Sequence, residues 1–313
     1  MKYINYTMVW LMVMLATNAC KRNEVEAPDF DVAVSKTSFA VKETVSFNFS
    51  GNPDNISFFS GEKGKRFEYR GRTKAAGIPV LKFTYSRASG TQTGSLALMY
   101  STNFMGPGAD EAETAANILK AKWDETTWRA VQVGTSIPSG DIDLTEIAKE
   151  DKPVYIAFKY TALAGSIQPK WTISELTLTN TLADGSIYTL ANLTATAITN
   201  YGVATTFSPG WVAAKVKNNY TWVISSGKSL VITGATTAAN ATAASEAWTF
   251  IGPVDLRKVS PDMGEFVKDM TTRASNFTFE YSAAGNYSAA FVASRDNIYG
   301  KAETVKKINL TVQ

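Results

Sequence analysis

Both ends of the chain show apolar residues alternating with polar ones, a pattern typical of β-strands that bury one face. Turn residues separate these stretches, as in Gly51-Asn52-Pro53-Asp54-Asn55. The polar stretch 294–304 is predicted to be a loop. The alternation predicts six short strands, within residues 30–34, 45–49, 56–58, 277–281, 287–293 and 308–312.

Neither end is long enough to form a stable domain alone. Residues 29–64 fall below the ~40 residues that a domain needs to hold a core without a disulfide, a metal or a partner. Residues 262–313 are also marginal, whereas the two segments together approach the ~100 residues of an immunoglobulin-like sandwich. We therefore predict one discontinuous domain with the middle of the chain inserted between its halves. The alternative is two separate small β-domains.

The middle of the chain is also rich in predicted strands, among which 154–160 has the clearest alternation. Only 109–118, rich in Ala and Glu, indicates a helix. The apolar positions change parity between Ile173 and Leu176, which predicts a β-bulge. Short strands at this spacing, with turns rich in Gly, Asn and Thr, predict a jelly-roll sandwich.

The predicted fold class is therefore all-β, with an immunoglobulin-like sandwich and an inserted jelly-roll β-sandwich. The predicted parts are a signal peptide (1–19), a tether (20–28), the first half of the immunoglobulin-like domain (29–66), the jelly roll (67–257) and the second half of the immunoglobulin-like domain (258–313).

The first twenty residues predict export. Lys2, the apolar run Met8–Ala16 and a small residue before Cys20 form a secretory signal peptide, whose apolar run is too short to span a bilayer. The position of Cys20 resembles a bacterial lipoprotein signal, and the resemblance implies that its thiol is acylated and becomes the new N-terminus. The alternative is an ordinary signal peptide with an unrelated cysteine nearby.

Composition narrows the chemistry. Charged residues make up 19% of the chain, and removal of Lys2 with the signal leaves 30 basic and 28 acidic residues, a net charge of +2. There is one cysteine and no histidine, which excludes an intrachain disulfide, histidine-dependent nucleophiles and histidine-ligated metals. We expect neither an enzyme nor a cofactor, and no nucleic-acid partner.

Aromatic side chains are the first candidates for ligand binding, because the C–H faces of sugar rings stack on them. Trp211 follows the turn residues Ser208-Pro209-Gly210 and is predicted to be exposed. Trp128 and Tyr299 are the next candidates. The remaining tryptophans of the mature chain lie in alternating stretches and are predicted to belong to the core: Trp123, Trp171, Trp222 and Trp248.

A basic and aromatic segment, residues 63–74, contains the binding candidates Arg66, Tyr69 and Arg70. One interpretation is that its arginine and lysine stems cover the crossing between the domains and pair with nearby carboxylates. The other is a site for an acidic glycan.

Acidic residues are candidates for metal binding or hydrolysis. Asp141, Asp143 and Asp110 could supply oxygens to a structural calcium, which needs six to eight of them. A glycosidase would need two carboxylates in a cleft, and Asp124, Glu125, Asp141 and Asp143 could be nominated without any motif that selects among them.

Several motifs resemble known families. Tyr281-Ser-Ala-Ala-Gly-Asn-Tyr287 followed by Phe291-Val-Ala-Ser294 is similar to the closing strands of a polycystic-kidney-disease-type (PKD) immunoglobulin-like domain. Val45–Phe49 with Phe58–Gly64 resembles the opening half of such a domain. These resemblances imply PKD-like halves at the two ends of the mature chain.

The middle of the chain resembles secreted jelly-roll modules related to carbohydrate-binding modules and cleaved-adhesin domains. The matching stretches are Lys122–Trp128, Gly140–Leu144, Val154–Tyr160 with Trp171–Ile173, and Glu246–Asp255. The whole chain resembles a Bacteroidetes family of outer-membrane lipoproteins with a domain of no assigned function. Phe59–Gly64 with Phe67–Thr73 is the most specific part of that resemblance.

The resemblance implies a lipid-anchored protein of the outer membrane, exposed at the cell surface. We expect a non-catalytic role, the binding of a polysaccharide for an uptake complex. A structural or adhesion subunit without a sugar site is the alternative, and a carboxylate-dependent glycosidase is the third.

Overall fold

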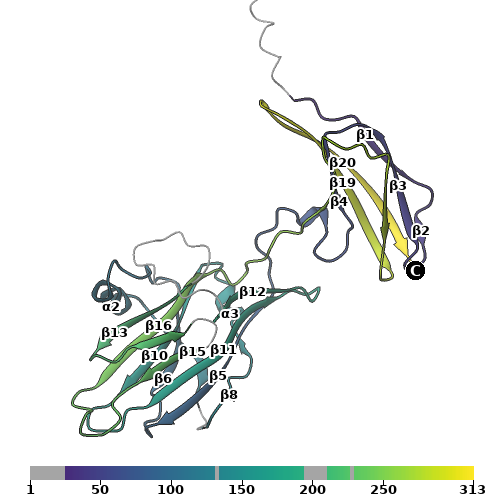
Figure 1. Ribbon diagram of the computed structural model, residues 1–313. Helices are drawn as coiled ribbons and strands as arrows, with labels where there is room; N and C mark the ends of the chain where they lie inside the picture. Colours follow the sequence, from purple (N-terminus) through teal and green to yellow (C-terminus); the bar gives the residue numbers. More distant parts are fainter. Residues whose placement is uncertain (1–24, 131–133, 194–209, 226–228) are drawn as a thin grey trace, which may run out of the picture. The chain divides into compact units, whose positions relative to one another are not determined.

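The computed structural model describes residues 25–130, 134–193, 210–225 and 229–313. The predicted signal peptide, Cys20 and the first part of the predicted tether lie outside these residues. The chain divides into two compact units (Figure 1). Unit 1 joins the chain up to Arg72 with Pro261–Gln313, and unit 2 is Thr73–Ser260. Both are β-sandwiches, which confirms the predicted all-β fold class.

Unit 1 consists of two sheets whose strands come from both ends of the chain. One sheet has the strand order β1-β3-β18 and the other β17-β4-β19-β20-β2. All pairings are antiparallel except β2 with β20. Its elements are β1 (Phe30–Val34), β2 (Ser38–Phe39), β3 (Thr44–Gly51), β4 (Asn55–Phe59), the 3-10 turn η1 (Phe67–Tyr69), β17 (Glu265–Lys268), β18 (Asn276–Glu280), β19 (Gly285–Asn297) and β20 (Gly300–Val312).

The core of unit 1 lies between these two sheets and is rich in phenylalanine. Phe47 of β3, Phe58 of β4 and Phe291 of β19 are each at most 1% exposed, and the ring centroid of Phe291 lies 4.9 Å and 4.8 Å from those of the other two. Residues from the first and last described strands, β1 and β20, therefore share one hydrophobic interior. Because neither segment buries these rings alone, each depends on the other for its core.

One expectation for unit 1 is wrong. Residues 294–304, predicted to be a loop, continue β19 to Asn297 and begin β20 at Gly300, and the two strands pair along their whole length. Figure 1 shows this hairpin projecting at its tip from the rest of unit 1. Its polar composition reflects two exposed faces, because strand pairing requires backbone hydrogen bonds and not burial.

Unit 2 is a larger sandwich. A five-stranded sheet has the order β13-β16-β10-β6-β7, and a second sheet has the path β14-β15-β11-β5-β8, with β12 paired to β11 and β9 to β5. Its elements are β5 (Ile78–Ser89), β6 (Leu96–Ser101), α2 (Glu111–Lys120), β7 (Asp124–Arg129), β8 (Ile137–Pro138), β9 (Ile142–Asp143), α3 (Thr145–Ala148), β10 (Val154–Ala162), β11 (Lys170–Thr181), β12 (Ile187–Asn192), β13 (Trp211–Lys217), β14 (Trp222–Ser225), β15 (Ser229–Thr233) and β16 (Ser245–Val254).

The main core of unit 2 fills the space between its sheets and includes Phe158, Tyr160 and Trp171. A smaller cluster on the other face of the five-stranded sheet packs Ile118 of α2 against Trp248 and Phe250. The helix therefore covers a sheet face that would otherwise be apolar and exposed. In the part of the chain that the structure describes, none of the helices has the length and hydrophobicity needed to span a bilayer.

The predicted bulge is present in β11. Its pairing with β5 changes register between Ser174 and Thr177, and Glu175 adopts a φ of +53°. The unit boundaries differ from the predicted ones, since unit 1 extends to Arg72 and resumes at Pro261. The reason is that residues 67–72 pack on unit 1, as the contacts below show.

Candidate functional site

Trp211, the leading aromatic candidate, is a core residue. It begins β13, is 1% exposed, and its ring stacks on Phe158 with centroids 6.3 Å apart and 18° between the ring planes. The prediction that Trp211 is exposed is wrong, because the strand starts immediately after Gly210 and turns this ring into the core between the sheets. Ser208 and Pro209 lie outside the described residues.

The other two aromatic candidates differ from each other. Trp128 on β7 is 8% exposed, and its ring centroid lies 4.9 Å from Phe83 and 5.3 Å from Tyr85. It is therefore part of the core and cannot present a ring face to a sugar. Tyr299, between β19 and β20, is 58% exposed. Of the three predicted residues, Tyr299 is the one whose ring a ligand could reach.

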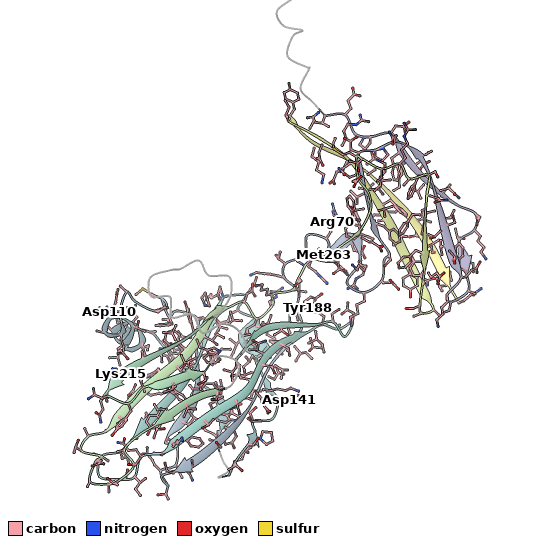
Figure 2. All side chains as sticks on the ribbon, in the orientation of Figure 1. Arg70, Asp110, Asp141, Tyr188, Lys215 and Met263 are labelled. Atoms are coloured by element: carbon pink, nitrogen blue, oxygen red, sulfur yellow. The ribbon has the colours of Figure 1, made fainter. Side chains whose placement is uncertain are left out.

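Asp110, one of the calcium candidates, is a helix cap. Its carboxylate accepts a hydrogen bond from the Glu113 backbone N–H at 2.8 Å, at the start of α2. The Glu113 carboxylate accepts in turn from the Ala109 backbone N–H at 2.7 Å, so the two side chains form a reciprocal cap. Figure 2 shows Asp110 and Asp141 on different sides of unit 2.

Asp141 and Asp143 also have local partners. Asp141 forms an ion pair with Lys82, with 2.9 Å between Oδ1 and Nζ. Asp143 accepts from the Thr145 backbone N–H at 2.7 Å, and the hydrogen bonds from Thr145 hold the pKa of Asp143 below its ordinary value. In the described part of the chain, no three Cys, His, Asp or Glu side chains are grouped to hold a metal ion. The structure therefore does not assemble the predicted calcium site.

Two arginines of the basic segment have a structural role. Arg66 Nε lies 3.2 Å from Asp262 Oδ2 and Arg72 Nη2 lies 3.7 Å from Asp262 Oδ1, and the Asp262 side chain is 1% exposed. Both guanidinium groups also lie over the ring of Tyr69, at 4.5 Å and 3.9 Å from its centroid. These contacts join residues 66–72, where the chain leaves unit 1, to Asp262, where the chain returns to unit 1. For Arg66 and Arg72, the structure therefore agrees with the interpretation that they pair with a nearby carboxylate.

Arg70 differs from its neighbours. Its guanidinium carbon lies 3.8 Å from the centroid of Phe67, and its Nη1 donates to the Phe67 carbonyl at 3.2 Å. Phe67 is buried, and its ring meets that of Phe59 edge to face at 5.5 Å. Among the residues that the structure describes, no carboxylate pairs with Arg70. Arg70 is therefore an exposed cation that is held in place by an aromatic ring.

A shallow groove of about 200 Å³ opens beside Arg70 on unit 1. Along β4 and β19, Ser57, Val292 and Ser294 alternate with the core residues Phe58 and Phe291, so they face away from the core. The hairpin of β19 and β20 forms part of the groove. Its lining residues are Ser57, Phe59, Arg70, Gly264, Val292, Ser294, Lys301 and Glu303.

The groove crosses several strands of the five-stranded sheet. Ser57 of β4 lies opposite Val292 of β19, which in turn lies opposite Val305 of β20. On the other side, Ser57 lies opposite Phe266 of β17, which is 61% exposed. The exposed ring of Phe266 therefore lies at the β17 end of the row of residues formed by Ser57, Val292 and Val305.

Charges line the side of the groove formed by the hairpin. Lys301 Nζ lies 2.7 Å from Glu303 Oε1, and this hydrogen bond raises the pKa of Lys301. Nearby, the Lys307 ammonium lies 5.1 Å from the centroid of Phe67, the ring that also carries Arg70. Figure 2 labels Arg70, near the point where the chain leaves unit 1, and Met263, near the point where it returns.

In a comparison with protein families, residues 19–198 match the family described as Domain of unknown function (DUF5017). The chain belongs to the DUF5017 family. The match covers β1–β4 of unit 1 and β5–β12 of unit 2, and it ends before the strands that complete either sandwich. Neither the curated proteins nor the solved structures gave a match.

In this DUF5017 protein, sequence reasoning found only part of the groove. Arg70 was identified from the basic segment, whereas Ser57, Ser294, Lys301 and Glu303 were missed. Side chains alternate between the two faces of a strand, and this alternation could have found them. If β19 and β20 are extended through residues 294–304, Ser294 and Glu303 fall on the same face of the sheet. Taking that polar stretch as a loop hid this register.

Proposed function

We propose that this DUF5017 protein is a lipoprotein anchored by Cys20 at the cell surface of the outer membrane, where it binds a polysaccharide for an uptake system without cleaving it. The observation that carries the binding role is the groove of unit 1, in which Arg70 is held in place and has no carboxylate partner among the described residues. Acylation of Cys20 rests on the sequence, and the family match from residue 19 onward is compatible with it.

The chemistry of the groove suits a sugar chain better than a small apolar ligand. Half-buried Ser57 brings a hydroxyl group, which can exchange hydrogen bonds with sugar hydroxyls, whereas Ser294 is 6% exposed. The exposed ring of Phe266 flanks the same strand row and offers a stacking face. An open groove across neighbouring strands admits a long polymer, whereas a closed pocket would admit only its end.

The non-catalytic reading has its support in the available side chains. The chain contains no histidine, so acid–base chemistry at neutral pH would depend on carboxylates, Lys or Tyr. The carboxylates nominated for hydrolysis have cationic or backbone partners: Asp124 pairs with Lys122, and Glu125 with Arg129. Neither carboxylate lines the groove.

We also propose that unit 1 is related to PKD-type immunoglobulin-like domains and that unit 2 is a jelly roll. In support of the first relation, the hydroxyl of buried Tyr281 donates to the Ser60 carbonyl at 2.8 Å. Its ring stacks on Tyr287 at 4.3 Å. The Tyr287 hydroxyl in turn donates to the Ala283 carbonyl, four residues upstream, at 2.9 Å. A tyrosine bonded to the backbone a few residues upstream is a feature of immunoglobulin sandwiches.

Binding is tested by native electrophoresis of the detergent-extracted mature protein through gels that each contain one polysaccharide, neutral or acidic. We expect retardation in at least one gel and no decrease in polymer chain length after prolonged incubation. Normal migration in every gel would contradict the binding role, and release of oligosaccharides would establish hydrolysis instead.

The lipid anchor has its own test. Cells that produce Cys20→Ser are compared with wild type by fractionation and by labelling with a fatty acid that carries a detectable tag. We expect the label and the membrane association to be lost in the variant. An unmodified wild-type protein would contradict the anchor without affecting the binding role.

A structural or adhesion subunit is the second candidate, favoured by one observation. Met263, Phe266 and Met270, all in or beside the edge strand β17, are each at least 61% exposed. Exposed Met and Phe side chains in one short segment are common at protein interfaces. A protein that binds no polysaccharide and co-purifies stoichiometrically with a membrane partner would favour this candidate.

A further inference from the structure

We propose that the groove of unit 1 recognises an anionic sugar, one that carries a carboxylate or a sulfate ester, through Arg70. The inference rests on the proposed polysaccharide-binding role and specifies the chemical class of the ligand. It follows from how Arg70 is positioned, from how the surrounding charges are paired, and from which of its N–H groups remain available.

Arg70 is positioned before any ligand arrives. Its backbone N–H and its Nη1 both donate to the Phe67 carbonyl at 3.2 Å, and its guanidinium carbon lies 3.8 Å from the centroid of the Phe67 ring. Phe67 itself packs with Phe59 and Ala290 in a buried cluster on the sheet. A side chain held in this way loses little conformational entropy on binding, which favours affinity.

The charges around the groove leave an excess of positive charge. Arg66 and Arg72 share the buried carboxylate of Asp262, and Lys301 pairs with Glu303. Within the described ranges, neither Arg70 nor Lys307 has a carboxylate partner. Both lie against the Phe67 ring, at 3.8 Å and 5.1 Å from its centroid. Two cations are thus brought together on one aromatic ring.

The guanidinium fork selects the kind of anion. An arginine side chain has five N–H donors, and the structure gives one hydrogen bond from the side chain of Arg70, from Nη1. The remaining N–H groups can donate to two oxygens of one carboxylate or sulfate, which is the strongest common pairing of arginine. A neutral sugar would leave the charge of Arg70 and Lys307 unmatched.

The hydroxyl groups of the groove then account for the rest of the sugar. Ser57 and Ser294 lie on neighbouring strands, and Asn55, two residues before Ser57, is paired directly with Ser294. Half-buried Ser57 and Asn55 can bond to sugar hydroxyls beside the anionic group, whereas Ser294 is 6% exposed. Together with the exposed Phe266 ring, they describe a subsite for one charged sugar within a longer chain.

The test measures dissociation constants of the detergent-extracted mature protein for four polymers at low and high salt. Polygalacturonate supplies carboxylates, its methyl ester removes their charge on the same backbone, dextran sulfate supplies sulfate, and dextran is its neutral counterpart. The proteins are wild type, Arg70→Gln, Arg70→Lys and the control Lys82→Gln, whose lysine pairs with Asp141 on unit 2. Circular dichroism confirms that each variant is folded.

We expect wild type to prefer one charged polymer over its neutral counterpart, and the preferred polymer identifies carboxylate or sulfate. Arg70→Gln should weaken that binding at least ~10-fold, which corresponds to about 1.4 kcal/mol, and should reduce its salt dependence. Arg70→Lys should lie between the two, because an ammonium lacks the planar fork. Lys82→Gln should bind as wild type does.

Two outcomes would overturn the inference. Equal binding of a charged polymer and its neutral counterpart, unaffected by Arg70→Gln, would reject an anionic ligand but leave polysaccharide binding intact. A charged polymer whose binding is lost in Lys82→Gln and kept in Arg70→Gln would place the site on unit 2. Absence of binding to all polysaccharides, neutral ones included, would instead reject the proposed function itself.

Discussion

Each unit carries a shallow hollow on the face of its larger sheet that is turned away from the core, and the two hollows differ in how their charges are paired. The hollow of unit 2, about 300 Å³, is lined by Lys82, Asp141 and Glu175 among hydroxyl-bearing residues, and Lys82 and Asp141 neutralise each other. The groove of unit 1 has Arg70 without a carboxylate partner among the described residues. Charged lining residues therefore differ in what they could offer a ligand, because Asp141 neutralises Lys82 whereas no described carboxylate pairs with Arg70.

The aromatic residues differ between the units as well. The six tryptophans that follow Trp10 all belong to unit 2, and five of them are buried: Trp128, Trp171, Trp211, Trp222 and Trp248. Trp10 is the one tryptophan in the sequence of unit 1, and the core of this unit is rich in phenylalanine. Tryptophan fluorescence therefore follows the unfolding of unit 2, and a ligand bound in the groove of unit 1 should leave it unchanged.

The largest expected effect tests the placement of Trp211 in the core of unit 2. Trp211→Ala should destabilise unit 2 by about 3–5 kcal/mol, because it leaves a cavity beside Phe158. The measurement is urea unfolding followed by tryptophan fluorescence, with the milder Trp211→Phe measured in parallel. Tyr299→Ala, at an exposed position of unit 1, is the control and should change stability by less than ~0.5 kcal/mol. Equal effects of Trp211→Ala and Tyr299→Ala would contradict the buried placement.

The next effect concerns the buried carboxylate that pairs the structural arginines of unit 1. Asp262→Asn removes the carboxylate charge that Arg66 and Arg72 share and should cost roughly 2–3 kcal/mol, less than a fully buried pair because both arginine side chains retain some exposure. Hydrogen exchange should accelerate in residues 61–72. The exposed pair on unit 2 provides the matched control, since Asp141→Asn should cost at most ~1 kcal/mol. Unchanged exchange in 61–72 would show that Asp262 does not hold this segment.

A smaller effect tests the bond that joins the two halves of unit 1. Tyr281→Phe removes the donor to the buried Ser60 carbonyl and should destabilise unit 1 by about 1–2 kcal/mol. Tyr287→Phe removes a comparable bond to the Ala283 carbonyl at an exposed position and should cost less than ~0.5 kcal/mol. Hydrogen exchange of β19 and β20 reports both, because fluorescence does not follow unit 1. A larger loss in Tyr287→Phe than in Tyr281→Phe would contradict the argument.

The smallest effect is the pH dependence of Asp143 on unit 2. Hydrogen bonds from Thr145 lower the pKa of this carboxyl, so its stabilising contribution is present above the unfolded pKa, about 3.9, and is lost as the pH falls through the lower folded pKa. The difference in free energy of unfolding between wild type and Asp143→Asn, measured by urea denaturation, should be under ~1 kcal/mol at neutral pH and should shrink below about pH 4. A difference that grows on acidification would show that the sign is wrong.

Periodicity predicted most strands and one irregularity. The change in which positions are apolar after Ile173 indicated a bulge, and the pairing of β11 with β5 shifts register there. The helix expected over 109–118 is α2 at Glu111–Lys120, a shift of two residues. Short elements were missed, including η1 and α3, because one turn of helix leaves no periodic signal.

The candidate site was predictable only in part. Arg70 could be selected by the run of basic and aromatic residues, but nothing in that run distinguished it from Arg66. The distinction depends on Asp262, nearly two hundred residues later, which pairs with Arg66 and not with Arg70. Trp211 failed as a candidate for a related reason, because turn residues before a tryptophan do not determine which face of the next strand is buried.

The sequence alone determined that the chain is all-β, because alternation with period two is a local property of strands. It also established the absence of histidine and the single cysteine, and with them the chemistry that the chain lacks. Only the tertiary structure decided which cations are neutralised and which aromatic rings are accessible. Both depend on contacts between residues far apart in the chain, and no local pattern records them.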